Sequence, residues 1–350
     1  MLEAIVSKIN ALVYDGTGLH IGLKSLYFVY FFAICGIIPV LWTAIYCLSN
    51  LYMKLAGPVN LKKKYNAKWA LVTGASSGIG RELSKVLASQ GLSVVLVALA
   101  DNDKTPPHMS LNTILDELKS TYKGQEFRKI EASFNYGVDY MPAIIDGTKD
   151  IDVQLIFNNA GFIVSGFFDT TTLNAQLNNL ECNTTSCVKV THHFLQLLIQ
   201  KELKGCIMFT SSVSGYFPNP FAIMYGATKA FVSQFAASLA IEVRAKGIDV
   251  LAVHPSPVAS NFFNSVTHKI DALDMAKKAA VSPATVPKLM LSCVGRSHLG
   301  DLGSTAFFMR FFAAILPMDF LTGLISSVAP NLPDYQRNNI NRGSGGKKLD

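Results

Sequence analysis

The feature that most constrains this chain is a glycine-rich turn between a predicted strand and a predicted helix. Residues 69–72 form a short apolar run, residues 73–80 read Thr-Gly-Ala-Ser-Ser-Gly-Ile-Gly, and an amphipathic pattern with Leu83, Val86 and Leu87 follows. Glycine permits a tight turn and close approach of the backbone to phosphate groups, while the helix N-terminus supplies free N–H groups and positive potential. The pattern therefore predicts a dinucleotide pyrophosphate site formed by Gly74, Ser76, Ser77, Gly78, Ile79 and Gly80.

Residues 68–255 alternate apolar runs with helical patterns. After the first run, further short apolar runs occupy residues 94–97, 153–157, 206–209 and 248–253. Such runs are typical of strands that are buried on both faces, and their alternation with helices indicates a parallel sheet covered on both sides. The expected fold class is α/β: a Rossmann-like doubly wound parallel sheet, with an N-terminal transmembrane anchor described below.

A second motif carries a phenol and an ammonium group one helical turn apart. Tyr225 and Lys229 stand at i and i+4, so they share one helix face. An ordinary tyrosine has a pKa of about 10, and an adjacent ammonium group is expected to lower it. Such a pair alone is usually a solvated helix face. Ser212, 13 residues before Tyr225, changes this interpretation because its hydroxyl can hold a substrate oxygen beside the phenol.

Together with the glycine turn, further landmarks appear in a fixed order along the chain. Asn158-Asn159-Ala160-Gly161 follows the apolar run at 153–157, Asn183 lies in the next helix, and Ser211-Ser212 precedes the tyrosine motif. Over residues 68–265 this order resembles the short-chain dehydrogenase/reductase family. The resemblance implies that Tyr225 protonates a carbonyl oxygen while hydride reaches the carbon. The implied catalytic residues are Asn183, Ser212, Tyr225 and Lys229, where Lys229 also bonds the nicotinamide ribose and Asn183 holds a water that passes protons to Lys229.

The same resemblance implies the residues that contact the cofactor. Asn159, Ala160 and Gly161 are expected to bind it or to stabilise the sheet beside it. The implied set comprises Gly74, Ser76, Ser77, Gly78, Ile79, Gly80, Arg81, Asn159, Ala160, Gly161, Tyr225, Lys229, Pro255, Val258 and Ser260.

Cofactor choice is normally read at the end of the second strand. Ala98 and Leu99 stand there and are neither acidic nor basic, and Asp101 lies slightly beyond. Arg81, directly after the glycine turn, can reach a 2′-phosphate, and Ser133 replaces an aspartate that is common near the adenine. NADPH is the expected cofactor on the broader resemblance, and NADH remains the alternative.

A long apolar stretch near the N-terminus predicts a membrane anchor. No charged side chain occurs from Ser25 to Met53. A bilayer core needs about 20 apolar residues in a helix, and the stretch is too long for the core of a signal peptide. A buried core helix is the less favoured alternative. Lysines concentrate after the stretch, at residues 62–64 with Lys54 and Lys68, so the positive-inside rule predicts that the rest of the chain faces the cytosol.

Residues 305–328 form a second apolar segment, which Arg310, Pro317 and Asp319 interrupt. We expect a hydrophobic helix that lies on the membrane or against a substrate tunnel, and not a second span. The expected organisation is an anchor and basic linker at 1–67, a reductase domain at 68–300, and a hydrophobic C-terminal segment with a flexible tail at 301–350.

The tail ends in Lys347-Lys348-Leu349-Asp350 after a Gly/Ser spacer. Lysines at the third and fourth positions from the carboxyl terminus resemble the dilysine retrieval signal of endoplasmic-reticulum membrane proteins. A flexible spacer on a cytosolic tail would keep such a signal readable. The sequence therefore predicts a protein of the endoplasmic-reticulum membrane whose catalytic domain faces the cytosol.

Composition argues against two other classes of protein. The net charge of +7 is dispersed and no nucleic-acid module is recognised, so no nucleic-acid partner is expected. No metal is expected, because His192 and His193 have no Asp, Glu or Cys at ligand spacing. The six cysteines show no CxxC spacing, which indicates reduced thiols.

The whole layout resembles the membrane-bound very-long-chain 3-oxoacyl-CoA reductase / 17β-hydroxysteroid dehydrogenase type 12 branch of the family. That resemblance implies NADPH-dependent reduction of a long-chain 3-oxoacyl-CoA to the 3-hydroxyacyl-CoA in fatty-acid elongation, with other enzymes of that cycle as partners and a possible homodimer. One alternative is the same chemistry on a steroid, retinoid or other lipid carbonyl. A non-catalytic binding protein is a second alternative, which the altered adenine pocket at Leu99 and Ser133 motivates. A structural membrane protein is the third and least favoured.

Overall fold

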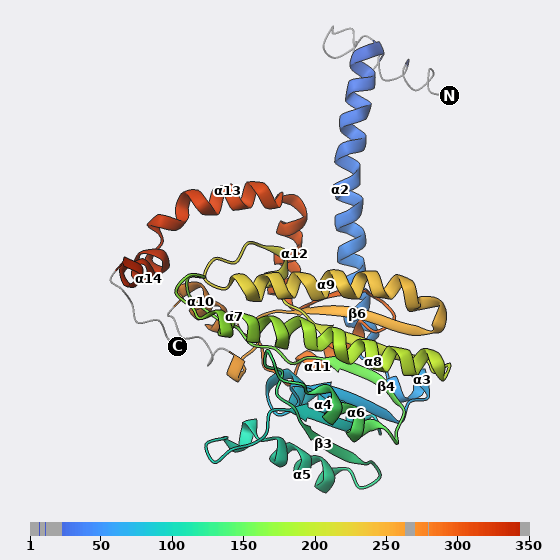
Figure 1. Ribbon diagram of the computed structural model, residues 1–350. Helices are drawn as coiled ribbons and strands as arrows, with labels where there is room; N and C mark the ends of the chain where they lie inside the picture. Colours follow the sequence, from blue (N-terminus) through green and yellow to red (C-terminus); the bar gives the residue numbers. More distant parts are fainter. Residues whose placement is uncertain (1–6, 8–10, 12–22, 263–269, 279, 344–350) are drawn as a thin grey trace. The chain divides into compact units, whose positions relative to one another are not determined.

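The computed structural model describes residues 7, 11, 23–262, 270–278 and 280–343 (Figure 1). Its contacts divide the chain into two compact units, Met1–Leu55 and Ala56–Asp350. The first unit contains most of helix α2, Leu23–Ala56. Within this helix Tyr30–Ala56, 27 residues, is long and apolar enough to cross a membrane. Pro39 lies inside α2 without ending it, as spanning helices tolerate.

The second unit is built on a parallel sheet. In the described residues this sheet has seven strands in the order β3-β2-β1-β4-β5-β6-β7. The order reverses between β1 and β4, which makes the sheet doubly wound and creates a crevice at the carboxyl ends of these two strands. The predicted α/β, Rossmann-like fold class is confirmed. The strands are β1 Trp69–Thr73, β2 Ser93–Ala98, β3 Phe127–Glu131, β4 Val153–Asn158, β5 Gly205–Thr210, β6 Ile248–Pro255 and β7 Leu299–Leu302.

Helices and helical turns connect these strands. The segments that position the site or cover the sheet are α3 Leu61–Tyr65, α4 Gly78–Ser89, α5 Leu111–Thr121, α6 Met141–Thr148, α7 Leu173–Leu180, the π-helical turn η2 Glu181–Thr185, α8 Ser186–Gln200, the 3-10 turn η3 Val213–Tyr216, α9 Ile223–Val243, α10 Asp271–Lys278, α11 Val286–Ser292, α12 Ser304–Ile315, α13 Met318–Val328 and α14 Pro333–Gly343.

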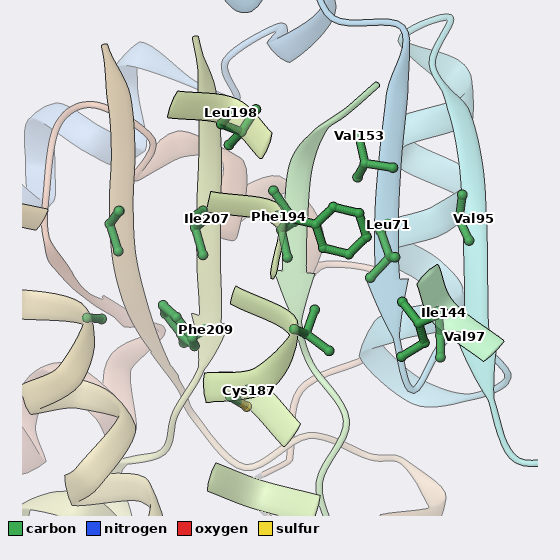
Figure 2. Packing of buried hydrophobic residues seen from close by; sticks show 14 of the residues in the cluster. Leu71, Val95, Val97, Ile144, Val153, Cys187, Phe194, Leu198, Ile207 and Phe209 are labelled. Atoms are coloured by element: carbon green, nitrogen blue, oxygen red, sulfur yellow. The ribbon is translucent and has the colours of Figure 1, made fainter. Parts of the chain in front are cut away.

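The apolar runs that predict strands form the centre of the core. Successive side chains of a strand point to opposite faces, so alternate residues of each run serve one layer of helices. On one face α6, α8 and α9 cover a continuous buried cluster. Figure 2 shows Phe194 of α8 among strand residues of this cluster, with its ring towards Leu71 of β1. Removing a buried phenylalanine ring of this kind costs about 3–5 kcal/mol.

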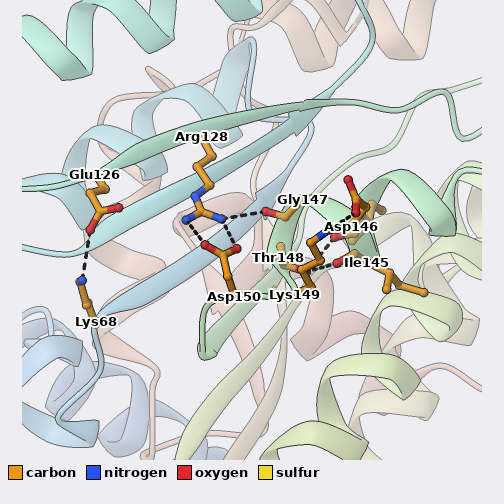
Figure 3. Close-up of polar contacts among 10 residues, drawn as sticks. Lys68, Glu126, Arg128, Ile145, Asp146, Gly147, Thr148, Lys149 and Asp150 are labelled. Carbon is orange, nitrogen blue, oxygen red and sulfur yellow. Dashed lines mark hydrogen bonds and ion pairs between the residues drawn. The ribbon is translucent and has the colours of Figure 1, made fainter.

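Two strands carry no continuous apolar run, and the sequence pattern does not reveal them. The edge strand β3 has only two apolar residues, Phe127 and Ile130, and its Arg128 donates to both oxygens of Asp150 at 2.6 and 2.7 Å (Figure 3). The guanidinium group also lies 5.0 Å from the centroid of the Trp69 ring. Ion pairs on an edge strand discourage pairing with other chains. β7 has only four residues and includes Gly300 and Asp301.

The C-terminal part of the chain breaks at a proline. α12 ends before Pro317, which precedes the first turn of α13, and the two helices are bent by 104°. α12 begins against the sheet, where Ala306 is fully buried and its N–H donates to Ser256 Oγ at 3.1 Å. The predicted dilysine signal at Lys347 and Lys348 lies outside the described residues.

Candidate active site

The glycine turn lies at the carboxyl end of β1 and leads directly into α4. Gly74 has a φ of +65°, and a Cβ on it would lie 2.9 Å from Ala160 Cα. A Cβ on Gly80 would lie 2.2 Å from the Gly74 carbonyl oxygen, so neither position has room for a side chain. The first amides of α4 have no intrahelical acceptor, and Ser77 makes no side-chain cap. This stretch, with Ser76 and Ile79 beside it, fits a pyrophosphate group.

Thr73, at the end of β1, fastens this turn to the segment after β4. Its Oγ1 accepts from the backbone N–H of Asn159 at 2.9 Å and of Ala160 at 3.0 Å. The Asn159 amide donates to the Thr73 carbonyl at 3.2 Å, and Asn159 Oδ1 accepts from Thr210 Oγ1 at 3.1 Å. The ends of β1, β4 and β5 are thus joined by side chains. Sequence reasoning assigned no role to Thr73, although a polar residue closing a buried strand was a usable signal.

Asn183 lies in the π-helical turn η2, between α7 and α8. Its amide Nδ2 donates to the Phe162 carbonyl at 3.0 Å and to Thr228 Oγ1 at 3.1 Å, while Oδ1 accepts from the Phe162 N–H at 3.0 Å. A Cβ on Gly161 would lie 3.1 Å from Asn183 Oδ1 and 3.3 Å from Lys229 Nζ. The structure therefore brings Gly161, Asn183 and Lys229 together, and π turns are frequent at functional sites.

Tyr225 and Lys229 are buried in the first turns of α9. Lys229 Nζ donates to the Thr210 carbonyl at 2.8 Å and lies 5.6 Å from the centroid of the Tyr225 ring. Burial raises the pKa of Tyr225 to about 12, and a hydrogen bond with Ser212 acts in the opposite direction. Burial also lowers the pKa of Lys229. The net shift of the Tyr225 pKa is upward, against the expected lowering, because desolvation of the phenolate outweighs the influences that favour it.

Apolar side chains pack around the phenol. Ile163, Ala222 and Tyr225 form a buried cluster against which Phe262 packs, with its ring 5.3 Å from the tyrosine ring. Ser212 contributes a hydroxyl to this region from the segment after β5, where it also accepts from the Ser214 N–H at 3.2 Å. The surroundings of the phenol therefore suit an apolar carbonyl compound.

The residues implied to follow β6 are placed differently from one another. Ser260 lies over the glycine turn, since a Cβ on Gly78 would be 3.2 Å from Ser260 Cβ. Pro255 pairs with Leu302 at the end of β6, and Val258 forms an isolated parallel bridge with Val281. Ser260 thus stands beside the predicted phosphate site. Pro255 and Val258 instead fix the backbone of the segment that leads from β6 to Ser260.

The adenine side has two charged groups that are already engaged. The Asp101 carboxylate accepts from the backbone N–H groups of Leu111 at 2.8 Å and Asn112 at 2.9 Å, so it caps α5. Arg81 donates to Glu117 Oε2 at 2.8 Å. Leu99, at the end of β2, is 63% exposed. A contact between Arg81 and a 2′-phosphate stays a prediction, and it would compete with Glu117.

A buried polar chain lies behind Ser212 and was missed by the sequence analysis. Ser211 Oγ is 2.8 Å from Ser233 Oγ, which is 2.9 Å from His254 Nε2, and His254 Nδ1 lies 3.4 Å from Asp301 Oδ1. The Tyr216 hydroxyl donates to the same Asp301 oxygen at 2.8 Å. These residues come from four separate segments, so no local motif reveals them. Across the described part of the chain no group of three or more His, Cys, Asp or Glu side chains is placed to hold a metal ion.

Comparisons with known proteins agree with this geometry. The short chain dehydrogenase family matches residues 68–271. Very-long-chain 3-oxoacyl-CoA reductase-B of Danio rerio is 29% identical over 269 residues, which cover 74% of this chain and 81% of that protein. 17-beta-hydroxysteroid dehydrogenase type 3 of Mus musculus is 32% identical over 206 residues, 58% of this chain and 64% of that protein. A solved short-chain dehydrogenase from Sphingobium yanoikuyae in complex with NADPH is 26% identical with a TM-score of 0.60, over 74% of this chain and 95% of that one. The chain belongs to the short-chain dehydrogenase family.

Proposed function

We propose that this protein is an NADPH-dependent reductase that converts a long-chain 3-oxoacyl-CoA to the 3-hydroxyacyl-CoA in fatty-acid elongation. The observation that carries the proposal is the grouping of Ser212 with the buried Tyr225 and Lys229 at the mouth of the doubly wound sheet, next to a turn that fits a pyrophosphate. A solved relative binds NADPH, which supports the cofactor, and NADH remains the alternative.

The chemistry follows from the states of these groups. The phenol of Tyr225 is protonated at neutral pH and holds the proton that the substrate oxygen needs, although burial, which raises its pKa to about 12, makes it a weaker acid. Ser212 holds the substrate carbonyl oxygen beside the phenol, and the hydride for the carbonyl carbon would come from NADPH held at the glycine turn. The proton from Tyr225 completes the alcohol. The Lys229 ammonium near the ring stabilises the phenolate that remains. Asn183 fixes the loop after β4 against α9 and so positions Lys229.

The substrate class rests on two kinds of support. The apolar surroundings of Tyr225 and the apolar helix α2 suit a substrate that partitions into lipid. The name of the Danio rerio relative favours an acyl-CoA, and the name of the Mus musculus relative favours a steroid carbonyl as the second candidate. The proposed location is the endoplasmic-reticulum membrane with the catalytic domain facing the cytosol, and the proposed partners are the other elongation enzymes.

A homodimer through α9 belongs to the same proposal. Phe231 and Ile241 of this helix are exposed, and the Phe231 ring stacks on Phe235 at 5.9 Å. Exposed apolar residues on one helix supply the surface that an isologous contact needs.

The test is an assay of purified membranes with a long-chain 3-oxoacyl-CoA and, in parallel, a steroid ketone, each with NADPH and with NADH. We expect turnover of the acyl-CoA with NADPH. Tyr225→Phe should abolish turnover and leave cofactor binding nearly unchanged, because it removes one hydroxyl. Tyr136→Phe is the matched control, since it makes the same change at an exposed position.

Two outcomes would count against the proposal. Normal turnover by Tyr225→Phe would refute the mechanism. Absence of turnover with either substrate would favour another lipid carbonyl or the non-catalytic binding protein, for which the exposed Leu99 at the adenine side is the supporting observation.

A further inference from the structure

The helices α12 and α13 form an apolar corner, defined here as residues 308–328. The two helices meet at Pro317 with a bend of 104°. Each presents large apolar side chains to the outside at helical spacing. The exposed apolar residues are Phe308, Phe312 and Ile315 of α12 and Met318, Phe320, Leu324 and Val328 of α13.

The chain enters and leaves this corner from the same domain. At the start Ala306 is buried against the sheet and bonds Ser256, and Arg310 Cζ lies 4.7 Å from the centroid of the Tyr216 ring. At the end, the α14 residue Tyr335 packs edge-on against Phe167 with ring centroids 5.3 Å apart. The neighbouring Asp334 carboxylate accepts from the Asp271 N–H at 2.9 and 3.0 Å. Both ends of the corner are therefore tied to one face of the molecule.

Neither helix is long enough to span a bilayer alone, and the two together reach that length only across a bend of 104°. α12 has 12 residues and α13 has 11. At about 1.5 Å per residue they are about 18 and 16 Å long, whereas the hydrocarbon core of a bilayer is about 30 Å thick. With both ends held at the same domain, the corner can enter one leaflet and must return.

The pattern of α13 fits a helix that lies in the plane of a membrane interface. Phe320, Leu324 and Val328 form an exposed stripe at i, i+4 and i+8, while Leu321 is buried against the protein. The other residues of α13 include the apolar Met318 and Ile325 and the polar Thr322, Ser326 and Ser327, and they carry a single charge, Asp319. Amphipathic helices with such an apolar face bury it about 5–10 Å into the boundary of headgroups and acyl chains.

The hydroxyl groups of α13 are compatible with lipid surroundings. Thr322 Oγ1 donates to the Met318 carbonyl at 2.8 Å, and Ser327 Oγ donates to the Gly323 carbonyl at 2.9 Å. Hydroxyls that bond back to the preceding turn need no partner from outside, as is common in lipid-exposed helices. The same chain carries α2, which is able to cross a bilayer and would keep the domain at a lipid surface.

We propose that the apolar corner is a second membrane contact of this protein, which dips into one leaflet and returns without crossing it. Its attachments lie beside the active site: Tyr216 is four residues after Ser212, and Phe221, whose ring lies 5.0 Å from that of Phe167, is four residues before Tyr225. The mouth of the site then faces the leaflet in which a lipid substrate dissolves. This last step rests on the proposed function, whereas the membrane contact does not.

Depth-dependent quenching in the full-length protein tests the membrane contact. In a Trp42→Phe background, which leaves the buried Trp69 as the baseline, a tryptophan replaces Phe320 in one variant and Tyr136 in the other; both positions are 56% exposed. In bilayers whose acyl chains carry bromine, we expect about twofold or stronger quenching for Phe320→Trp and none beyond the baseline for Tyr136→Trp. Equal responses of the two variants would overturn the proposal. Enzyme activity does not enter this readout, so failure of the proposed function would leave the result unchanged.

Two further measurements distinguish the proposed membrane contact from a full span and from a contact with a second copy of the chain. In sealed vesicles an epitope added after Asp350 should be cleaved by protease from the same side as the catalytic domain; a protected epitope would show a span and overturn the return. Phe320→Cys, in a chain whose exposed Cys35 and Cys47 are replaced by alanine, should not form disulfide-linked pairs under oxidant. Efficient pairing would assign the surface to a second copy of the chain.

Discussion

The hydroxyl of Thr73 offers the sharpest test of how the site is held together. It is 2% exposed and accepts from the N–H groups of Asn159 and Ala160 at 2.9 and 3.0 Å. Thr73→Val keeps the shape of the side chain and leaves both amides without this acceptor. A buried unsatisfied group costs about 1–3 kcal/mol, so we expect a loss of about 2–6 kcal/mol in the free energy of unfolding. Because Gly74 follows directly, cofactor affinity should fall as well.

Thr73→Ser is the matched control, because it retains the hydroxyl and loses one methyl group, at a cost of about 1 kcal/mol. Thermal unfolding of both variants in the same detergent measures the difference. One kcal/mol corresponds to about 2–4 °C in domains of roughly 150–250 residues, so the valine variant should melt at least several degrees below the serine variant. Equal melting temperatures and equal NADPH affinities would refute the claim that this hydroxyl joins β1 to the segment after β4.

Three further predictions concern pH, the C-terminal helices and location. Burial lowers the pKa of His254 to about 3, so the unfolded chain binds this proton at a higher pH than the folded chain does. The neutral His254 therefore contributes its full share to the free energy of unfolding above about pH 6.5. This share is lost as the pH falls towards 3, at about 1.4 kcal/mol per pH unit. Unfolding at pH 7 and pH 5 should therefore show a smaller acid loss for His254→Gln than for the wild type, and an unchanged slope would contradict the assignment. Arg310→Met removes the cation over Tyr216 and should lower kcat by about 2- to 30-fold with cofactor affinity unchanged, while Arg310→Lys recovers most of it; loss of both kcat and cofactor binding would indicate general misfolding instead. Replacing Lys347 and Lys348 by serine should move the protein beyond the endoplasmic reticulum without loss of activity in membranes. If microscopy shows no relocation, the N-terminal anchor and not the tail determines the location of the protein.

The sequence predicts the central strands well because their signal is local. Runs such as residues 69–72 and 248–253 are apolar throughout, and only burial on both faces of a sheet explains that. The sequence does not reveal β3, because it lies at the edge of the sheet and three of its five residues, Arg128, Lys129 and Glu131, are charged. Four residues with Gly300 and Asp301 give β7 no pattern at all.

Some features of the candidate site are likewise visible in the local sequence, and others depend on distant parts of the chain. The spacing of Ser212, Tyr225 and Lys229 is visible in the sequence, whereas Thr73 acquires its role from residues 86 and 87 positions later in the chain. The sign of the Tyr225 pKa shift depends on how deeply the phenol is buried, which spacing does not encode. The sequence shows only that Asp101 lies slightly beyond the end of β2, and its three-dimensional neighbours show that it caps α5.

Because of the π-helical turn at Glu181–Thr185, the function of the site depends on the residue register of one long helix. α7, the turn and α8 follow one another without interruption from Leu173 to Gln200. A π turn accommodates one residue more than an α-helical turn, and each residue of an α-helix rotates the next by about 100°. Deleting one residue between α7 and Asn183 would let the helix become regular and would also turn the side chains on one side of the deletion by that angle. Asn183 would then point away from Phe162 and Thr228, so a change that improves the helix would dismantle the site.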